Sequence, residues 1–328
     1  MRSFLILVLL LALSIVAFFA NVAFGASPIT FSDLWSVLFS NNFDPILGQI
    51  IYDLRLPRAI TAVVAGVALS LAGLVMQTVF RNPLAGPYVL GVSSGASLGV
   101  ALVLLLGFGS MGILPAATLG SLMVMLVVVF AARRTVNTVS LLVIGLMIGY
   151  LVDSLVSLMI HFGDPERLAS YVGWGFGSFS RCRGADLLSF SSITIIATLA
   201  ILPSLKYLNN ILLGEESARS LGFSLAKHRV WVLTMASALA AAATVYCGPI
   251  GFLGLVVPHL ARHFFRTADH RILIPAVMLI GSTMALFSGW VVNLPTKGGA
   301  LPLNAITAFL GGPVVLWAML KSPRGVDG

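Results

Sequence analysis

Charged residues are scarce in this 328-residue chain: they make up 9% of it, whereas hydrophobic residues make up 59%. Soluble domains carry about 25% charged residues, so the composition excludes a water-exposed globule of this length. Cysteine is also rare, because Cys182 and Cys247 are the only two and give no disulfide framework. We expect one of them outside the membrane and the other within it, so we do not expect them to pair.

The chain lacks a G-x-x-x-x-G-K-[ST] motif, so it has no P-loop with which to bind ATP. Its 19 basic residues outnumber its 11 acidic residues, which would suit a nucleic-acid partner. Membrane proteins, however, also accumulate Lys and Arg on their cytoplasmic side. The hydrophobic composition favours this second explanation, and we predict an all-α polytopic membrane protein surrounded by lipid that binds no nucleic acid.

Hydrophobic residues fall into ten segments, most of them close to the ~20 residues that cross a bilayer. The stretch from Trp231 to Leu260 carries no charge and holds two of them, separated by the helix-breaking residues of Gly248–Gly254. The other eight lie at about 4–23, 56–80, 88–107, 113–132, 139–160, 186–205, 272–293 and 302–320. A polar connection at 26–54 and a charged loop at 206–229 interrupt them.

The distribution of Lys and Arg decides between nine and ten crossings. With a turn at Gly248–Gly254, thirteen of these residues lie inside and six outside; without the turn, nine lie inside and ten outside. The positive-inside rule therefore favours ten crossings in the inner (plasma) membrane, with both termini cytoplasmic. A cleaved signal peptide ending near Val22–Ala26 is the alternative for the first segment, although its apolar run exceeds the usual 7–15 residues.

The charged loop contains a stretch that predicts a short helix. Acidic residues at its start suit the helix dipole, and a glycine at its end suits a C-cap. This stretch is too polar to enter lipid, so it is either a solvated surface turn or a docking element for a cytoplasmic partner. Its residues are Gly214, Glu215, Glu216, Ser217, Ala218, Arg219, Ser220, Leu221 and Gly222.

Two features inside the segments suggest packing and function. Gly91, Gly95 and Gly99 follow the small-xxx-small pattern that lets membrane helices approach closely. Asp153 is the only acidic residue that we place within a crossing, and an intramembrane carboxylate is a candidate for the transport pathway. A structural hydrogen bond to a neighbouring helix near the outer surface is the alternative role for Asp153.

His259 and His263 lie four residues apart, a spacing that on a helix could bind a metal ion. The residues between them lack the glutamate of a zincin motif. We therefore favour a structural role for the pair and predict no metal site.

Six stretches, taken in order, resemble the permease subunits of type II ABC importers for ferric siderophores, haem and vitamin B12. They are RLPRAITAVVAGVALSLAGLVMQTVFRNPLAGP, LGVSSGASLG, GEESARSLGF, GPIGFLGLVVPHLAR, DHRILIP and NAITAFLGGPVVLW. The resemblance covers essentially the whole chain and implies one transmembrane permease domain over residues 1–328, with about ten helices. It also implies a second permease copy, two cytoplasmic ATPase subunits that bind ATP and Mg, and a periplasmic or lipid-anchored binding protein. The chain itself would then be no enzyme and hold no cofactor.

The resemblance assigns roles to particular positions. Arg55 and Arg58 match arginines that dock the binding protein, and Glu215–Gly222 matches the helices that couple to the ATPase. The cytoplasmic gate corresponds to Asn82, Leu84, Thr138 and Val139, where Val139 replaces a small polar residue.

The chain departs from the family pattern at one outer edge. Asn293 occupies a position where family members commonly carry another docking arginine, with Lys297 nearby as a substitute. The frequent Glu-Leu-Pro-x-Gly motif appears as Ala300-Leu-Pro-Leu-Asn304.

The sequence thus predicts the permease of an importer for a metal chelate, working by alternating access. An ion-driven secondary transporter is the alternative, but it would need intramembrane titratable groups beyond Asp153. An intramembrane metalloprotease would need more than the two histidines. The motifs do not distinguish siderophore, haem and cobalamin.

Overall fold

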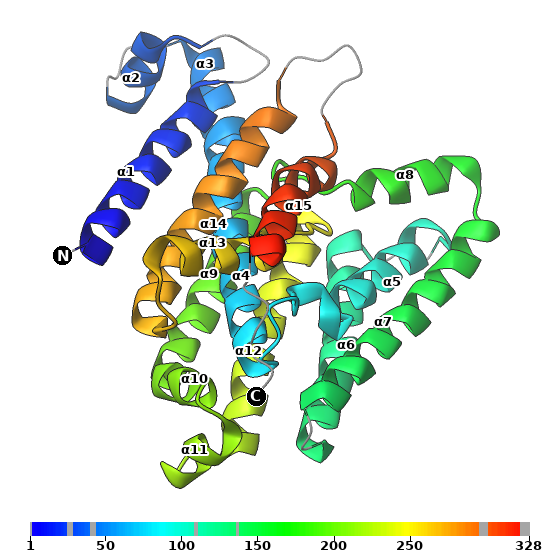
Figure 1. Ribbon diagram of the computed structural model, residues 1–328. Helices are drawn as coiled ribbons and strands as arrows, with labels where there is room; N and C mark the ends of the chain where they lie inside the picture. Colours follow the sequence, from blue (N-terminus) through cyan, green and yellow to red (C-terminus); the bar gives the residue numbers. More distant parts are fainter. Residues whose placement is uncertain are drawn as a thin grey trace.

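The computed structural model describes residues 2–24, 29–39, 44–107, 111–135, 138–294 and 301–321. Within these ranges every regular element is a helix (Figure 1). A π-helical segment, Ile50–Arg55, joins α3 to α4, and 3-10 turns at Pro87–Leu90 and Leu202–Ser204 precede α5 and α10. The α-helices are α1 (Arg2–Ala23), α2 (Phe31–Phe39), α3 (Pro45–Gln49), α4 (Leu56–Val79), α5 (Val92–Leu104), α6 (Ile113–Arg134), α7 (Thr138–His161), α8 (Pro165–Gly175), α9 (Gly184–Ile201), α10 (Leu205–Ile211), α11 (Glu215–Ser220), α12 (Leu225–Cys247), α13 (Leu253–Phe265), α14 (His270–Val292) and α15 (Leu303–Lys321).

Seven helical stretches of the described chain are long and apolar enough to cross a membrane. Two shorter apolar helices, Val92–Leu104 and Leu303–Trp317, and the 13-residue α13 correspond to the remaining predicted segments. The predicted all-helical membrane fold is therefore confirmed. The expected ten crossings are somewhat more than length and composition support, but they are compatible with these helices.

The second predicted segment begins earlier than expected. Its helix is continuous over 35 residues, Pro45–Val79, because Pro45 is the first helical residue and the Asp44 carboxylate accepts the Ile46 N–H at 2.9 Å. The expectation of a polar connection at 26–54 is therefore wrong for its last ten residues, and α2 also lies within it. Asp53 does not end the helix, since a polar residue is tolerated where a helix extends beyond the hydrocarbon.

The sixth predicted segment extends further than expected. The chain stays helical to Ile211 instead of ending at 205, because Tyr207, Leu208 and Ile211 bury an apolar face. The predicted break at Gly248–Gly254 is confirmed: α12 ends at Cys247, α13 starts at Leu253, and Gly248 takes a φ of 80°.

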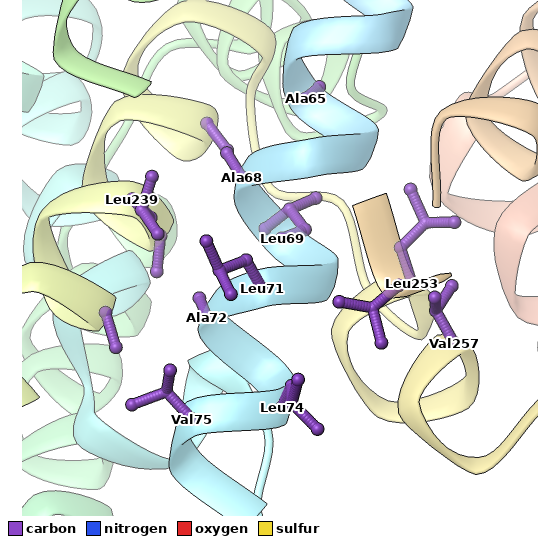
Figure 2. Close-up of a cluster of buried hydrophobic side chains, with 14 of the residues drawn as sticks. Ala65, Ala68, Leu69, Leu71, Ala72, Leu74, Val75, Leu239, Leu253 and Val257 are labelled. Carbon is purple, nitrogen blue, oxygen red and sulfur yellow. The ribbon is translucent and has the colours of Figure 1, made fainter. Parts of the chain in front are cut away.

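Helix α4 forms the centre of the bundle (Figure 1). Figure 2 shows Leu71 and Val75 of α4 near Leu239 of α12, while Leu253 and Val257 of α13 lie on the other side. Most of α4 is buried, so it contacts protein on nearly all sides rather than lipid.

Glycines allow the helices around α4 to approach closely. A Cβ at Gly66 would collide with the backbone of Gly281 in α14, and one at Gly73 with the backbone of Gly254 in α13. In α5, Gly95 and Gly99 face the backbone of α6 in the same way, as the sequence predicts. Gly91 differs, because it precedes α5 with a φ of 68°.

Candidate functional site

Helix α11 is the short helix predicted in the charged loop, and Figure 1 places it at the lower end of the bundle. Gly214 and Gly222 bracket it with φ values of 118° and 84°. Gly222 donates to the carbonyl of Arg219 at 3.0 Å and Phe223 to that of Ala218 at 3.2 Å. This pair of hydrogen bonds is a Schellman motif, which confirms Gly222 as the residue that ends the helix.

The Glu215 carboxylate, in the first turn of α11, joins three helices. Its Oε1 accepts a hydrogen bond from the Thr138 hydroxyl of α7 at 3.2 Å and from Arg229 Nη2 of α12 at 2.7 Å. The Arg229 side chain is 4% exposed, and that of Glu215 is 32% exposed. The arginine is thus removed from water while the carboxylate stays partly exposed, and loss of the carboxylate would leave a buried cation without its counter-charge.

This arrangement brings together two predicted sites, the gate at Thr138 and the coupling stretch. Sequence reasoning missed Arg229, because its burial becomes evident only once α12 is packed. The only hint in the sequence was that Arg229 ends a charged loop in which Glu215 and Glu216 are adjacent.

Helix α10, which precedes α11, is fixed to the α13–α14 turn through Asn209. Its amide donates to the Asp269 carboxylate at 2.8 Å, and its carbonyl oxygen accepts from the backbone N–H and Nδ1 of His270 at 2.9 and 2.7 Å. The hydrogen bonds from the Arg271 backbone and from Asn209 lower the pKa of Asp269 below its usual value. The loop is therefore tied to the bundle on both sides of Gly214.

One face of α11 and its flanks is exposed. Glu216, Arg219 and Leu221 are exposed, Leu221 by 61%, and Leu213 just before the helix is 73% exposed. Two apolar side chains beside a polar helix offer a mixed surface suited to a protein partner.

The other residues predicted for the gate lie on the turn after α4 and at the start of α7. Asn82 follows α4, and its side-chain oxygen accepts the Leu84 N–H at 2.9 Å, which shapes the turn. The Leu84 side chain is 45% exposed, and that of Val139, at the start of α7, is 66% exposed. The role of both apolar side chains in closing a passage stays a prediction.

The two arginines predicted to dock the binding protein, Arg55 and Arg58, cap the C-terminal end of α1. Arg55 donates from Nη1 to the carbonyls of Val22 and Ala23 at 3.0 and 2.5 Å, and Arg58 donates to that of Asn21 at 3.0 Å. A cation suits this end of a helix. Only 4% of Arg55 is exposed, so a docking contact by its side chain would require the cap to open. The docking roles stay predictions, and Lys297 lies outside the described residues.

The outer edge where the chain departs from the family pattern is bonded internally. Asn293 donates to the Gly289 carbonyl at 2.5 Å at the end of α14. The Asn304 side chain accepts the Gly251 N–H at 2.9 Å, and its backbone N–H donates to the carbonyl of Phe176 at 3.0 Å. Asn304 thus joins the start of α15 to the turn before α13.

Asp153 lies on α7 and is exposed in the single chain. It is close to α8, where burial raises the pKa of Tyr171 and the Asp153 charge adds to that rise. Its role in a pathway stays a prediction.

His259 Nδ1 donates to the Leu255 carbonyl at 2.8 Å, and His263 packs edge-on against Trp317, so each has a structural partner. The described residues contain no cluster of three or more metal-ligating side chains.

Known proteins resemble this chain along its length. The hemin transport system permease protein HmuU of Yersinia pestis is 33% identical and covers 97% of this chain and 96% of its own. The molybdate import system permease protein MolB of Haemophilus influenzae is 34% identical, in an alignment that covers 89% of this chain and 87% of MolB. The vitamin B12 import system permease protein BtuC of Salmonella typhi is 36% identical, in an alignment that covers 84% of this chain and 84% of BtuC. The solved structure of a metal-chelate type ABC transporter in an inward-facing conformation superposes on this chain with a TM-score of 0.86 at 30% sequence identity. The superposition covers 97% of this chain and 99% of the transporter chain.

Long apolar helices around a buried central helix, with a polar loop helix bonded to their ends, form the architecture of a multi-pass membrane protein. The model of the FecCD transport family matches residues 10–321. The chain belongs to the FecCD transport family, and it is the permease subunit of an ATP-binding-cassette importer.

Proposed function

We propose that this permease carries a metal chelate, such as a ferric siderophore, haem or cobalamin, across the inner membrane by alternating access. Two of the relatives act on hemin and vitamin B12, and the similar solved structure is of the metal-chelate type. The molybdate relative makes a small oxyanion the rival substrate.

The observation that carries the transport mechanism is the contact of Glu215 with both Thr138 and Arg229. We infer that α11 docks on a separate ATPase subunit through the exposed side chains of Glu216, Arg219 and Leu221. ATP-driven displacement of α11 would then act directly on the cytoplasmic ends of α7 and α12. The ATPase, rather than this chain, hydrolyses ATP.

The complete assembly has two permease copies, two ATPase subunits and a binding protein on the outer side. Arg58, which is partly exposed, is the stronger docking candidate of the two arginines. Charge complementarity at such a site mainly increases the rate and fixes the orientation of docking.

Charge reversal on the exposed face of α11 tests the coupling. In proteoliposomes with the ATPase and binding protein, Glu216→Arg should abolish ATP-dependent uptake and the stimulation of ATPase activity by the loaded binding protein. Glu166→Arg, a matched reversal in the first turn of α8, should leave the stimulation intact. Normal uptake and stimulation in Glu216→Arg would contradict the proposal.

Uptake of labelled ferric chelate, cobalamin and molybdate by the same proteoliposomes identifies the substrate. Uptake of molybdate alone would remove the chelate proposal. Uptake of a chelate driven by an ion gradient, without ATP, would favour the secondary-transporter alternative.

The orientation can be tested by labelling a single introduced cysteine. Both native cysteines are buried, so a cysteine in place of Arg219 can be labelled over a low background. We expect reaction from the cytoplasmic side only. Labelling from the outer side would contradict the predicted orientation of the chain in the membrane.

A further inference from the structure

A groove between α6 and α12 is not used by the mechanism above. Its volume is about 660 Å³, and its apolar wall includes Met125, Leu126 and Val129 of α6 and Val230 of α12. The two basic residues that line it are Arg133, in the last turn of α6, and Lys227, in the first turn of α12. Both are exposed.

Two further hollows adjoin the groove, one along α6 alone and one between α6, α9 and α12. A hollow of about 450 Å³ shares Leu126, Val129 and Arg133 with it, and a narrower one of about 140 Å³ shares Met125 and reaches Thr118. From Thr118 to Arg133 α6 rises by about 22 Å at 1.5 Å per residue. One leaflet of the hydrocarbon core is roughly 15 Å thick, so these hollows extend from the headgroup level through that leaflet.

Charge is found at one end only of this apolar path. In the part nearest Arg133 and Lys227, Trp231 also lines the groove, is 48% exposed and donates its indole N–H to the Ala200 carbonyl at 2.9 Å. Tryptophan favours the membrane interface, which places the two cations at headgroup depth. Arg134, the next residue of α6, is not among the residues that line the three hollows, and its guanidinium lies 5.2 Å from the ring centroid of Phe130.

We propose that the groove binds an anionic phospholipid, with its phosphate on Arg133 and Lys227 and an acyl chain along α6 and α12. Basic pockets between transmembrane helices on the cytoplasmic side suit anionic headgroups. An ATPase subunit would not reach the apolar part of the groove, which lies at hydrocarbon depth. The proposal rests on the cytoplasmic orientation proposed above, which the labelling at position 219 tests separately.

A bound lipid would bridge two helices near the coupling site. Lys227 lies two residues before Arg229, the partner of Glu215. The lipid would therefore hold the end of α6 at a fixed distance from the start of α12, beside the segment that α11 displaces.

The test measures lipid binding to the full-length permease, purified in detergent, by native mass spectrometry. Phosphatidylglycerol should bind in preference to phosphatidylcholine. Arg133→Gln and Lys227→Gln should each weaken phosphatidylglycerol binding about fivefold, and the double variant roughly 25-fold. Arg134→Gln is the matched control, since it removes the adjacent charge, and should change binding less than about twofold.

A second variant separates the groove from surface charge. Val129→Trp fills the groove and keeps both cations, and it should also reduce phosphatidylglycerol binding, with an unchanged elution volume as evidence of folding. Equal binding of both lipids, an equal effect of Arg134→Gln, or no effect of Val129→Trp would each overturn the proposal. Displacement of phosphatidylglycerol by free glycerol phosphate would also overturn the proposal. Cross-linking between protomers through a cysteine at position 129 would overturn it as well, because the groove would then be a contact between two copies of the chain.

Discussion

Helix α4 and the α11 loop both depend on glycine, but for opposite reasons. Around α4, Gly66 and Gly73 have ordinary helical backbones and no space for a side chain. Around α11, Gly214 and Gly222 have positive φ values and open space, since a Cβ there would meet no atom within 4 Å. The first region is held by close packing and the second by backbone conformation, so substitutions should affect the first through stability and the second through coupling.

The largest effect is expected at the centre of the bundle. Gly73→Ala places a methyl group against the Gly254 backbone, which would force α4 and α13 apart and cost about 3 kcal/mol or more. We expect little folded protein by size-exclusion chromatography and a lower melting temperature. Gly173→Ala in α8, where a Cβ meets nothing, is the control; a wild-type melting temperature for Gly73→Ala would show that packing there is loose.

The next effect concerns the ion pair that joins α11 to α12. Glu215→Gln leaves the buried Arg229 without its counter-charge, and we expect a loss of about 1–3 kcal/mol in stability. It should also reduce uptake more than ATPase turnover. Thr138→Val removes only the hydroxyl contact, so we expect smaller losses of stability and of uptake in that variant. Equal losses of uptake and ATPase activity in both variants would indicate general destabilisation instead.

A smaller effect is expected where α11 ends. Gly222→Ala forces alanine into a left-handed backbone at a cost of about 1 kcal/mol, whereas Gly222→Asn should be tolerated better, because asparagine adopts that conformation more readily. The melting temperature should change little in either variant, while coupled ATPase stimulation should fall in the order glycine, asparagine, alanine. An identical response to both substitutions would argue against a conformational cause.

The smallest effect should appear at the tie between α10 and α14. The pKa of Asp269 is lower in the folded protein than its usual 3.8, so its ionised form adds stability above that value and loses it as the pH falls through the folded-state pKa. For this partly exposed group we expect ~0.5 kcal/mol, including its N-cap hydrogen bond from the Arg271 N–H. Wild type should melt above Asp269→Ala at pH 7, and the difference should shrink near pH 3. A difference independent of pH would exclude the carboxylate charge as its source.

The sequence predicted most of the fold but not the contacts of the site. Apolar length and charge asymmetry located the helices and the turn after Cys247, because the bilayer imposes both. The same signals missed the start at Pro45, since Asp53 and Arg55 resemble the end of a crossing although the helix continues above the lipid. The link from Glu215 to Arg229 depends on how α11 and α12 pack, which residue spacing does not encode.

The arginines illustrate the same limit. Their match to the family's docking arginines suggested a contact with a binding protein, yet Arg55 is bonded to α1 carbonyls. A charged residue at a membrane boundary has two possible partners, a helix end or another protein, and one sequence does not distinguish them.

The helix from Pro45 to Val79 limits how this permease can change shape. Its regular part, the 24 residues of α4, measures about 36 Å, more than the ~30 Å hydrocarbon core. Arg55 just before α4 and the Asn82 turn just after it are therefore joined by one regular helix, and a tilt of α4 moves both ends together. Any bending during the transport cycle must fall to the π-helical segment Ile50–Arg55 or to the elements around α4.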